Sequence, residues 1–123
     1  KNPLDIAKLK DITGVFVGEH DFKAYCKSGS QVKTTVRKLY SVAVTDKAFD
    51  GGTDITIRVC GAGFLYNMVR TIAGTMINYA EESLSLEDIR RSLEKGDRES
   101  VGRTMPPQGL VLESVDYGYE LFS

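Results

Sequence analysis

The chain has 123 residues, of which 41% are hydrophobic and 27% are charged. This length fits one domain with a real hydrophobic core, and the composition is that of an ordinary globular protein. Lysine and arginine total 16 and aspartate and glutamate 17, and the resulting net charge of −1 argues against a uniformly basic nucleic-acid binder.

The N-terminal part is expected to be helical. Asn2 and Pro3 are typical of a helix start, with Asn2 as the N-cap, and hydrophobic residues recur at helical spacing to about Val17. The sequence GEHDF at residues 18–22 should interrupt this helix. Its Asp21 is expected to cap a second, short helix, and a Ser-Gly-Ser loop should follow.

Two strands are expected next. Within residues 35–49, Tyr40, Val42 and Val44 occupy alternate positions, and within residues 54–60 Ile55, Ile57 and Val59 do the same. The aspartate and two glycines between the two segments tolerate positive φ, as a hairpin turn requires. The sequence therefore predicts an antiparallel pair of strands, with Tyr40 on the same face as the two valines.

A long amphipathic helix is predicted over residues 64–82, after a tight bend at Gly61 and Gly63. Arg70 does not share the hydrophobic face. At about 100° per residue it lies roughly 125° from the centre of that face, so its charge should point away from the core. On spacing alone a solvent-facing charge is the commoner interpretation. The alternative is a guanidinium in a cleft, paired with a carboxylate or a phosphate.

The remaining sequence predicts one more helix and one more strand. Ser85 and Asp88 resemble a capping box at the start of a shorter helix. Residues 97–108 should form a loop or a helical turn, because two adjacent prolines exclude regular structure there. A last strand is expected over residues 110–117. The prediction is a single α+β domain over residues 1–123, with helices packed against a mainly antiparallel sheet.

Several kinds of site can be set aside. Gly61 and Gly63 match part of a dinucleotide fingerprint, but Tyr66 stands where the third glycine belongs. The metal-capable side chains at residues 19–21 include the chain's single histidine and have no second cluster, so no metal site is expected. The sequence contains neither a P-loop nor a Gly-x-Ser-x-Gly elbow.

A basic stretch offers a candidate contact with nucleic acid. From Lys23 to Lys38 the chain contains no acidic residue, and Lys33 and Arg37 lie within it. Tyr40 follows closely, so phosphate contact beside aromatic stacking is one interpretation. A solvated edge with no partner is the more frequent outcome for such a stretch.

The cysteines and the N-terminus bear on the cellular context. Cys26 and Cys60 are far apart and lack Cys-x-x-Cys spacing, so two reduced thiols in a cytoplasmic protein are expected. No hydrophobic run approaches transmembrane length, and no secretory signal is present. The chain begins with Lys1 rather than methionine, and we therefore expect it to be a piece of a longer protein.

Five segments, in the same order, resemble the TruA-type tRNA pseudouridine synthases. They are GEHDF at 18–22, KTTVR at 33–37, FLYNMVRTIAG at 64–74, KGDR at 95–98 and PQGLVL at 107–112. The resemblance covers nearly the whole chain but only the C-terminal half of such an enzyme. The Arg-x-Asp-x-Gly segment that carries the family's nucleophilic aspartate has no counterpart here, so the N-terminal catalytic-aspartate domain is expected to be absent.

The resemblance implies an enzyme that isomerises uridine to pseudouridine on the 3′ side of the tRNA anticodon arm. Such an enzyme is a homodimer and needs no metal or organic cofactor. Arg70 would be the ion-pair partner of the missing aspartate, and Leu110 would lie against the target base. Lys33, Arg37 and Lys38 would hold phosphates of the tRNA. This chain alone would supply half of the active-site cleft and would be inactive.

Two other functions stay open. A non-catalytic RNA-binding module would keep salt-sensitive tRNA affinity without any chemical role for Arg70. A structural or dimerisation domain would bind no RNA and would expose a hydrophobic patch to its partner.

Overall fold

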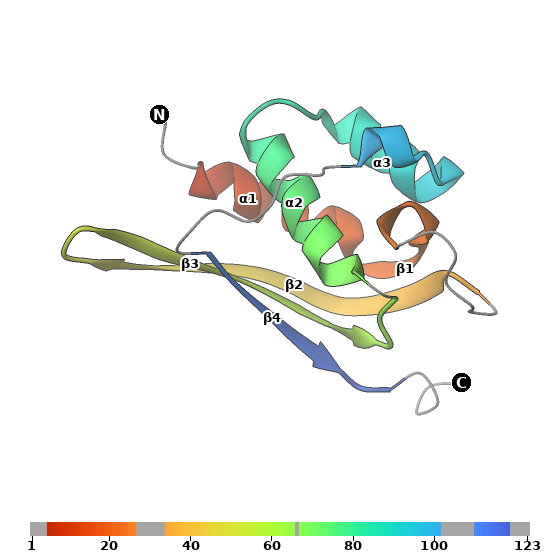
Figure 1. Cartoon of the computed structure of the whole chain (residues 1–123), viewed down its shortest axis with the longest axis horizontal. Coiled ribbons are helices and arrows are strands. Elements are labelled where there is room, and N and C mark those ends of the chain that lie inside the picture. Colours follow the sequence, from red (N-terminus) through yellow and green to blue (C-terminus); the bar gives the residue numbers. More distant parts are fainter. Residues whose placement is uncertain (1–4, 27–33, 66, 102–109, 119–123) are drawn as a thin grey trace.

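The computed structural model describes residues 5–26, 34–65, 67–101 and 110–118. Within these residues three α-helices lie on one face of a four-stranded sheet (Figure 1). The regular elements are α1 (Ile6–Ile12), β1 (Gly18–Asp21), β2 (Val36–Phe49), β3 (Gly52–Ala62), α2 (Met68–Ala80), α3 (Leu86–Lys95) and β4 (Leu110–Asp116), with short 3-10 helices at Thr13–Phe16, Lys23–Tyr25 and Arg98–Ser100.

The strand order is β1-β2-β3-β4, so neighbours in the chain are neighbours in the sheet. β1 pairs with β2 and β2 with β3 in antiparallel fashion, whereas β3 and β4 are parallel. A parallel pair needs a long crossover connection, and here α2 and α3 lie between the two strands in the sequence. The predicted α+β class is therefore confirmed, with a mixed sheet whose last strand is the parallel one.

The first helix is shorter than predicted. α1 begins at Ile6, and its N-cap is Asp5, whose carboxylate accepts a hydrogen bond from the Lys8 N–H at 3.2 Å. Asn2, the predicted N-cap, and Pro3 lie outside the described residues. The prediction of Asn2 as the N-cap is wrong for α1, because Asp5 has that position. α1 ends at Ile12 and continues as a 3-10 turn containing Gly14, a residue that weakens helix interiors.

The segment after this turn is an edge strand, not only a break. Gly18–Asp21 forms β1 and pairs with β2, with Gly18 opposite Leu39. The sequence did not indicate this strand, because it is short and polar and is held by backbone pairing. Asp21 does receive the Lys23 N–H at 3.1 Å, but the cap position of the following 3-10 helix is Phe22. The predicted Ser-Gly-Ser loop lies outside the described residues.

The predicted hairpin is confirmed, but a β-bulge changes which side chains face the core. The register shifts between Leu39 and Ser41. As a result Leu39 is buried together with Val42 and Val44, although it has the opposite parity. Tyr40, predicted on the face of the two valines, stands at the bulge and is only half-buried.

The core lies between the helices and one face of the sheet. From the sheet come Leu39, Ile57 and Val59, each no more than 1% exposed, and the helices cover them with α2 as the central element. The side chains of α2 that are no more than 1% exposed are Met68, Ile72, Ala73, Thr75, Met76 and Ile77. α2 is shorter than the predicted 64–82 helix, whereas the capping box of Ser85 and Asp88 at the start of α3 is confirmed.

A buried polar contact joins the 3-10 helix Lys23–Tyr25 to α3 inside this core. The Tyr25 ring is completely buried and meets Phe16 and Phe22 edge-on. Its hydroxyl lies 2.6 Å from Ser92 Oγ of α3, which itself donates to the Ile89 carbonyl at 2.5 Å. Tyr25 is therefore the donor toward Ser92. Burial raises the pKa of the Tyr25 phenol to about 12.

β3 ends at Ala62, and a bend that begins at Gly63 leads from it toward α2 (Figure 1). At Gly61 an added Cβ would lie 2.7 Å from Leu39 Cδ2 and 2.8 Å from the Lys38 carbonyl oxygen, so β2 approaches too closely for any side chain. Gly63 has φ of 79°, which glycine adopts without cost. The predicted bend therefore begins at Gly63, whereas Gly61, predicted as part of it, still pairs within β3. Among the described residues, no helix combines the length and hydrophobicity needed to cross a membrane.

Tyr25→Phe should lower the free energy of unfolding by about 1 kcal/mol near pH 7, because it removes a buried hydrogen bond. The raised pKa adds a pH effect. The contribution of the Tyr25 phenol is complete below pH 10 and declines by about 1.4 kcal/mol per pH unit as pH rises toward 12. Urea unfolding at pH 8, 10 and 11 measures both effects. The variant should show a shallower alkaline decline than wild type, and Tyr79→Phe, at a half-buried ring, serves as the control. Equal alkaline slopes in wild type and Tyr25→Phe would contradict the assignment.

Gly61→Ala should destabilise the protein by about 1–3 kcal/mol, because the new methyl group must displace β2 backbone and Leu39. Thermal and urea unfolding give the measurement. Gly14→Ala is the matched control, since its Cβ meets nothing within 4 Å. That control should be neutral or slightly stabilising. Similar stability losses for both substitutions would show that the close approach at Gly61 is not the cause.

Candidate active site and nucleic-acid interface

Arg70 occupies the first turn of α2 and is exposed. Its neighbours Met68 and Ile72 are completely buried, so the core packing fixes the rotation of the helix and turns Arg70 away from the core. The predicted orientation of this side chain is confirmed. The Arg70 side chain is thus at the surface, on a helix whose opposite face is packed in the core.

The start of α2 adds a favourable electrostatic environment for an anion. Asn67, the N-cap residue, is in the left-handed conformation with φ of 67°, and its side chain makes no capping hydrogen bond. Its carbonyl accepts from the Thr71 N–H and hydroxyl at 3.1 and 2.9 Å. The positive end of the α2 dipole and the Arg70 guanidinium both favour a nearby carboxylate or phosphate.

Lys38 lies at the same end of the sheet as this helix start. It is exposed on β2, opposite Ala62, the last residue of β3 before the bend. Its Nζ is 5.8 Å from the centre of the Tyr40 ring, and that ring meets Tyr117 edge-on with centroids 5.7 Å apart. Strand pairing therefore assembles one basic and two aromatic side chains. The sequence does not indicate a role for Tyr117, because Tyr117 meets Tyr40 only when β4 pairs with β3.

The other predicted phosphate contacts differ in their surroundings. Arg37 is half-buried at the start of β2, where one guanidinium nitrogen donates to the carbonyls of Thr34 and Val36 at 2.8 and 2.7 Å. These bonds tie Arg37 to the backbone of its own segment. Lys33 lies outside the described residues.

Leu110 is placed at the other end of β3. It is the first residue of β4, pairs with Ile55, and packs partly buried against the core. Gly61 lies six positions after Ile55 on β3, which is roughly 20 Å along a strand. The strand register therefore does not place Leu110 beside the bend, where Lys38 and the approach to α2 lie.

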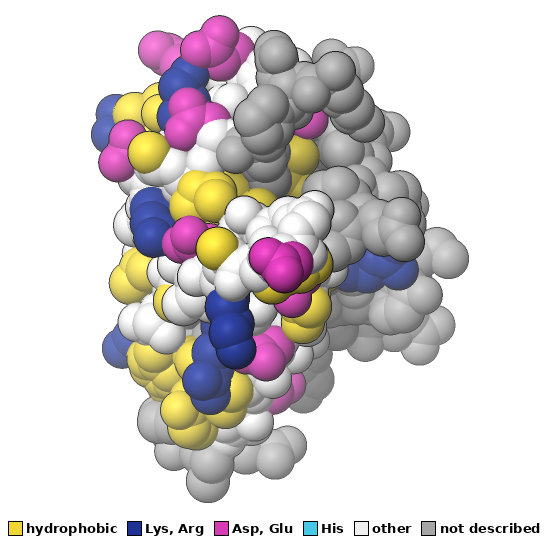
Figure 2. Space-filling model, turned by 90° about the vertical axis from the view of Figure 1, so that its left-hand side faces the viewer, with side chains coloured by type: hydrophobic (Ala, Val, Ile, Leu, Met, Phe, Trp, Pro, Cys, Tyr) yellow, Lys and Arg dark blue, Asp and Glu magenta, His cyan; other side chains and the backbone are white. Residues whose placement is uncertain are grey.

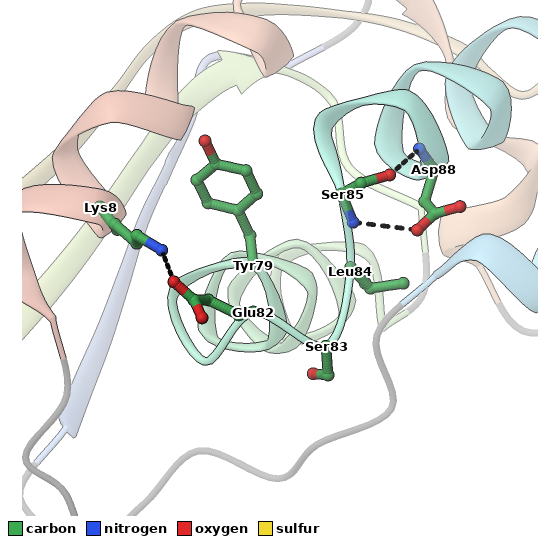
Figure 3. A pocket seen from close by; sticks show the side chains of 7 residues that line it. All are labelled: Lys8, Tyr79, Glu82, Ser83, Leu84, Ser85 and Asp88. Carbon is green, nitrogen blue, oxygen red and sulfur yellow. Dashed lines mark hydrogen bonds and ion pairs between the residues drawn. The ribbon is translucent and has the colours of Figure 1, made fainter.

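A shallow hollow of about 400 Å³ lies between α1 and the turn that joins α2 to α3 (Figure 3). Lys8 pairs with Glu82 on its rim, and this hydrogen bond raises the pKa of the Lys8 ammonium. Ser85 and Asp88 on the opposite side bond each other in the capping box. None of the predicted site residues that the structure describes lines this hollow, and its charged groups serve a helix cap and an ion pair.

The surface around the hairpin end carries both signs of charge. Seen from that side, basic and acidic side chains are interspersed with hydrophobic ones (Figure 2). Lys10 of α1, for example, pairs with Asp46 of β2 at 3.2 Å. Such mixed surfaces attract polyanions weakly.

The described residues contain no cluster of three or more His, Cys, Asp or Glu side chains that could hold a metal ion. Both cysteines are free thiols, with Cys26 buried and Cys60 half-buried. The described site residues act electrostatically: they offer an exposed guanidinium, a helix start and a lysine beside an aromatic ring.

The sequence matches known proteins over nearly its full length. Residues 13–118 match the family described as tRNA pseudouridine synthase. A tRNA pseudouridine synthase A of Citrifermentans bemidjiense is 44% identical over 118 residues, which cover 95% of this chain and 46% of that protein. Similar proteins of the same name occur in Bacillus velezensis, 41% identical over 94% of this chain and 45% of the relative, and in Listeria innocua, 40% identical over 93% and 45%.

The chain thus spans about half the length of these curated relatives. The match includes the bend, α2 with Arg70, and β4, so it covers the elements that form the candidate site. The α+β fold agrees with that family. The chain belongs to the tRNA pseudouridine synthase family.

Proposed function

We propose that this chain is the C-terminal half of a tRNA pseudouridine synthase that isomerises uridines in the anticodon arm. The nucleophilic aspartate is supplied by an N-terminal domain, and the chain alone is inactive. The main support is the position of Arg70, exposed in the first turn of a helix whose other face is locked in the core, within a family match over residues 13–118.

In this proposal Arg70 holds the aspartate ionised and oriented. A guanidinium offers two parallel N–H donors to a carboxylate, and the pair keeps the carboxyl pKa low in a partly dry cleft. The carboxylate can then act as the nucleophile at physiological pH. The open start of α2 contributes positive potential in the same region.

The overall reaction is an isomerisation, so no atom is gained or lost. The C1′–N1 glycosidic bond breaks, the uracil turns, and C5 bonds to C1′. The proton leaves C5, and N1 gains one. The target uridine must leave its stack to reach such a cleft. This chain contributes charge positioning and one wall of the cleft to that chemistry.

The surface that would hold the tRNA backbone includes Lys33, Arg37 and Lys38. Of these, Lys38 has the clearest structural support, because it is exposed beside Tyr40 and Tyr117 at the end of the sheet nearest the bend. We include Leu110 as a base contact on the strength of the sequence resemblance. The full-length enzyme is proposed to be cytoplasmic and homodimeric.

Arg70→Ala in the full-length enzyme should lower the rate of pseudouridine formation by at least about 100-fold, because the carboxylate loses its charged partner. Arg70→Lys should retain only a small part of the activity, since an ammonium cannot form the two-pronged contact. Chromatographic nucleoside analysis of initially unmodified tRNA provides the measurement. This chain alone should produce no pseudouridine.

Arg90→Ala is the control, because Arg90 is an exposed arginine on α3 away from the α2 start. It should leave the rate unchanged. Pseudouridine from this chain alone would show that the nucleophile is within it. A full-length protein that binds tRNA but forms no pseudouridine would support the RNA-binding module instead.

Lys38→Ala should weaken tRNA binding uniformly across sequences and reduce the salt dependence of the binding constant by about one counterion. Filter binding at salt concentrations between about 50 and 200 mM measures this salt dependence, as the slope of the logarithm of the binding constant against the logarithm of the salt concentration. Lys47→Ala, on the exposed hairpin end of β2, is the matched control. An unchanged slope for Lys38→Ala would remove Lys38 from the proposed tRNA surface.

A further inference from the structure

The end of β4 is connected to the bend before α2 by a carboxylate. Asp116 is the last residue of β4 and pairs with Gly61 in the parallel register. Its Oδ1 accepts hydrogen bonds from the Gly63 N–H at 2.9 Å and from the Gly118 N–H at 2.8 Å. The Tyr117 N–H donates to the Gly61 carbonyl at 2.9 Å. The bend is therefore held to β4 by both a side chain and the backbone.

This connection adds to other contacts of the same segment, since Phe64 packs against the core and the Met68 N–H donates to the Leu65 carbonyl at 3.1 Å. β2 fixes one side of Gly61 by close approach, but Gly63 turns away from the sheet with φ of 79°. The N-cap Asn67 makes no side-chain capping bond. Among the described residues between the bend and the first turn of α2, the buried side chains are those of Leu65 and Met68.

We propose that Asp116 is a positioning residue for the reaction: by accepting the Gly63 N–H it sets where α2 begins and hence where Arg70 is presented. The inference rests on the function proposed above. Core packing fixes the rotation of α2, and the Asp116 contact fixes the path of the chain into its first turn. An error of about 1 Å at a catalytic group can reduce a rate by roughly 100-fold, so a contact at Gly63, seven residues before Arg70, can affect catalysis through the path of the chain into α2.

The role requires an acceptor oxygen, not a negative charge. An asparagine keeps an oxygen at the same place and can accept the same N–H groups, whereas an alanine leaves both donors without it. The two substitutions therefore separate positioning by hydrogen bonding from any direct electrostatic part that the carboxylate could play in the cleft.

The test uses the full-length enzyme with Asp116→Ala, Asp116→Asn and the control Glu113→Ala, an exposed carboxylate on the same strand. We expect Asp116→Ala to lower kcat for pseudouridine formation by roughly tenfold with little change in KM for tRNA. Asp116→Asn should restore most of the rate, and Glu113→Ala should leave kcat unchanged. All rates are measured below the unfolding temperature of each variant, which is determined separately.

Hydrogen exchange provides a readout that does not depend on catalysis. In Asp116→Ala the peptide covering residues 61–68 should exchange faster, while the buried middle of α2 around Ile72 and Met76 should keep its protection. Faster exchange throughout α2 would mean general destabilisation and would overturn the positioning role. Unchanged kcat in Asp116→Ala, or equal loss in the alanine and asparagine variants, would also overturn it.

The two proposals fail in different ways. If wild-type enzyme forms no pseudouridine, the proposed function fails, whatever the exchange at the bend. If wild type is active and Arg70→Ala is not, but Asp116→Ala keeps full activity, the function stands and the positioning role of Asp116 is wrong.

Discussion

The close approach of β2 to the backbone of Gly61 is the constraint on which the candidate site depends. No Cβ fits there, since it would lie 2.7 Å from Leu39 Cδ2. Leu39 itself reaches the core only because the β-bulge after it reverses the alternation of side chains on β2. The bulge and the glycine are thus two parts of one arrangement, and together they determine where β3 ends and the chain turns toward α2.

The same arrangement explains why the site can combine rigidity with exposure. α2 buries a broad hydrophobic face against the sheet, with Met68, Ile72 and Met76 inaccessible to solvent. Such a face resists rotation, because turning the helix would expose several large side chains to water. The orientation of Arg70, on the opposite side of the helix, is therefore fixed while its side chain remains accessible to solvent. A charge that must meet a partner on another part of the protein requires this combination.

The parallel strand β4 has a different role from the antiparallel hairpin. Its pairing with β3 brings Asp116 and Tyr117 to the end of the sheet where the chain bends. It thereby adds a carboxylate to the bend and an aromatic ring to the pair formed by Lys38 and Tyr40. The crossover through α2 and α3 thus joins residues that are more than fifty positions apart in the sequence.

The amino-acid sequence by itself determined the elements whose cause is local. The hairpin, the bend at Gly63, the amphipathic α2 with Arg70 off its hydrophobic face, and the capping box of Ser85 and Asp88 follow from side-chain periodicity and backbone preferences. The functional interpretation came from the five sequence segments that resemble the pseudouridine synthases, because the spacing of residues alone does not indicate a reaction. Only the tertiary structure decided the strand Gly18–Asp21, the reversal of face at Tyr40, and the meeting of Asp116 with Gly63. Each of these depends on pairing between distant backbone segments, and the free energy of such pairing is not encoded in the residues of either segment alone.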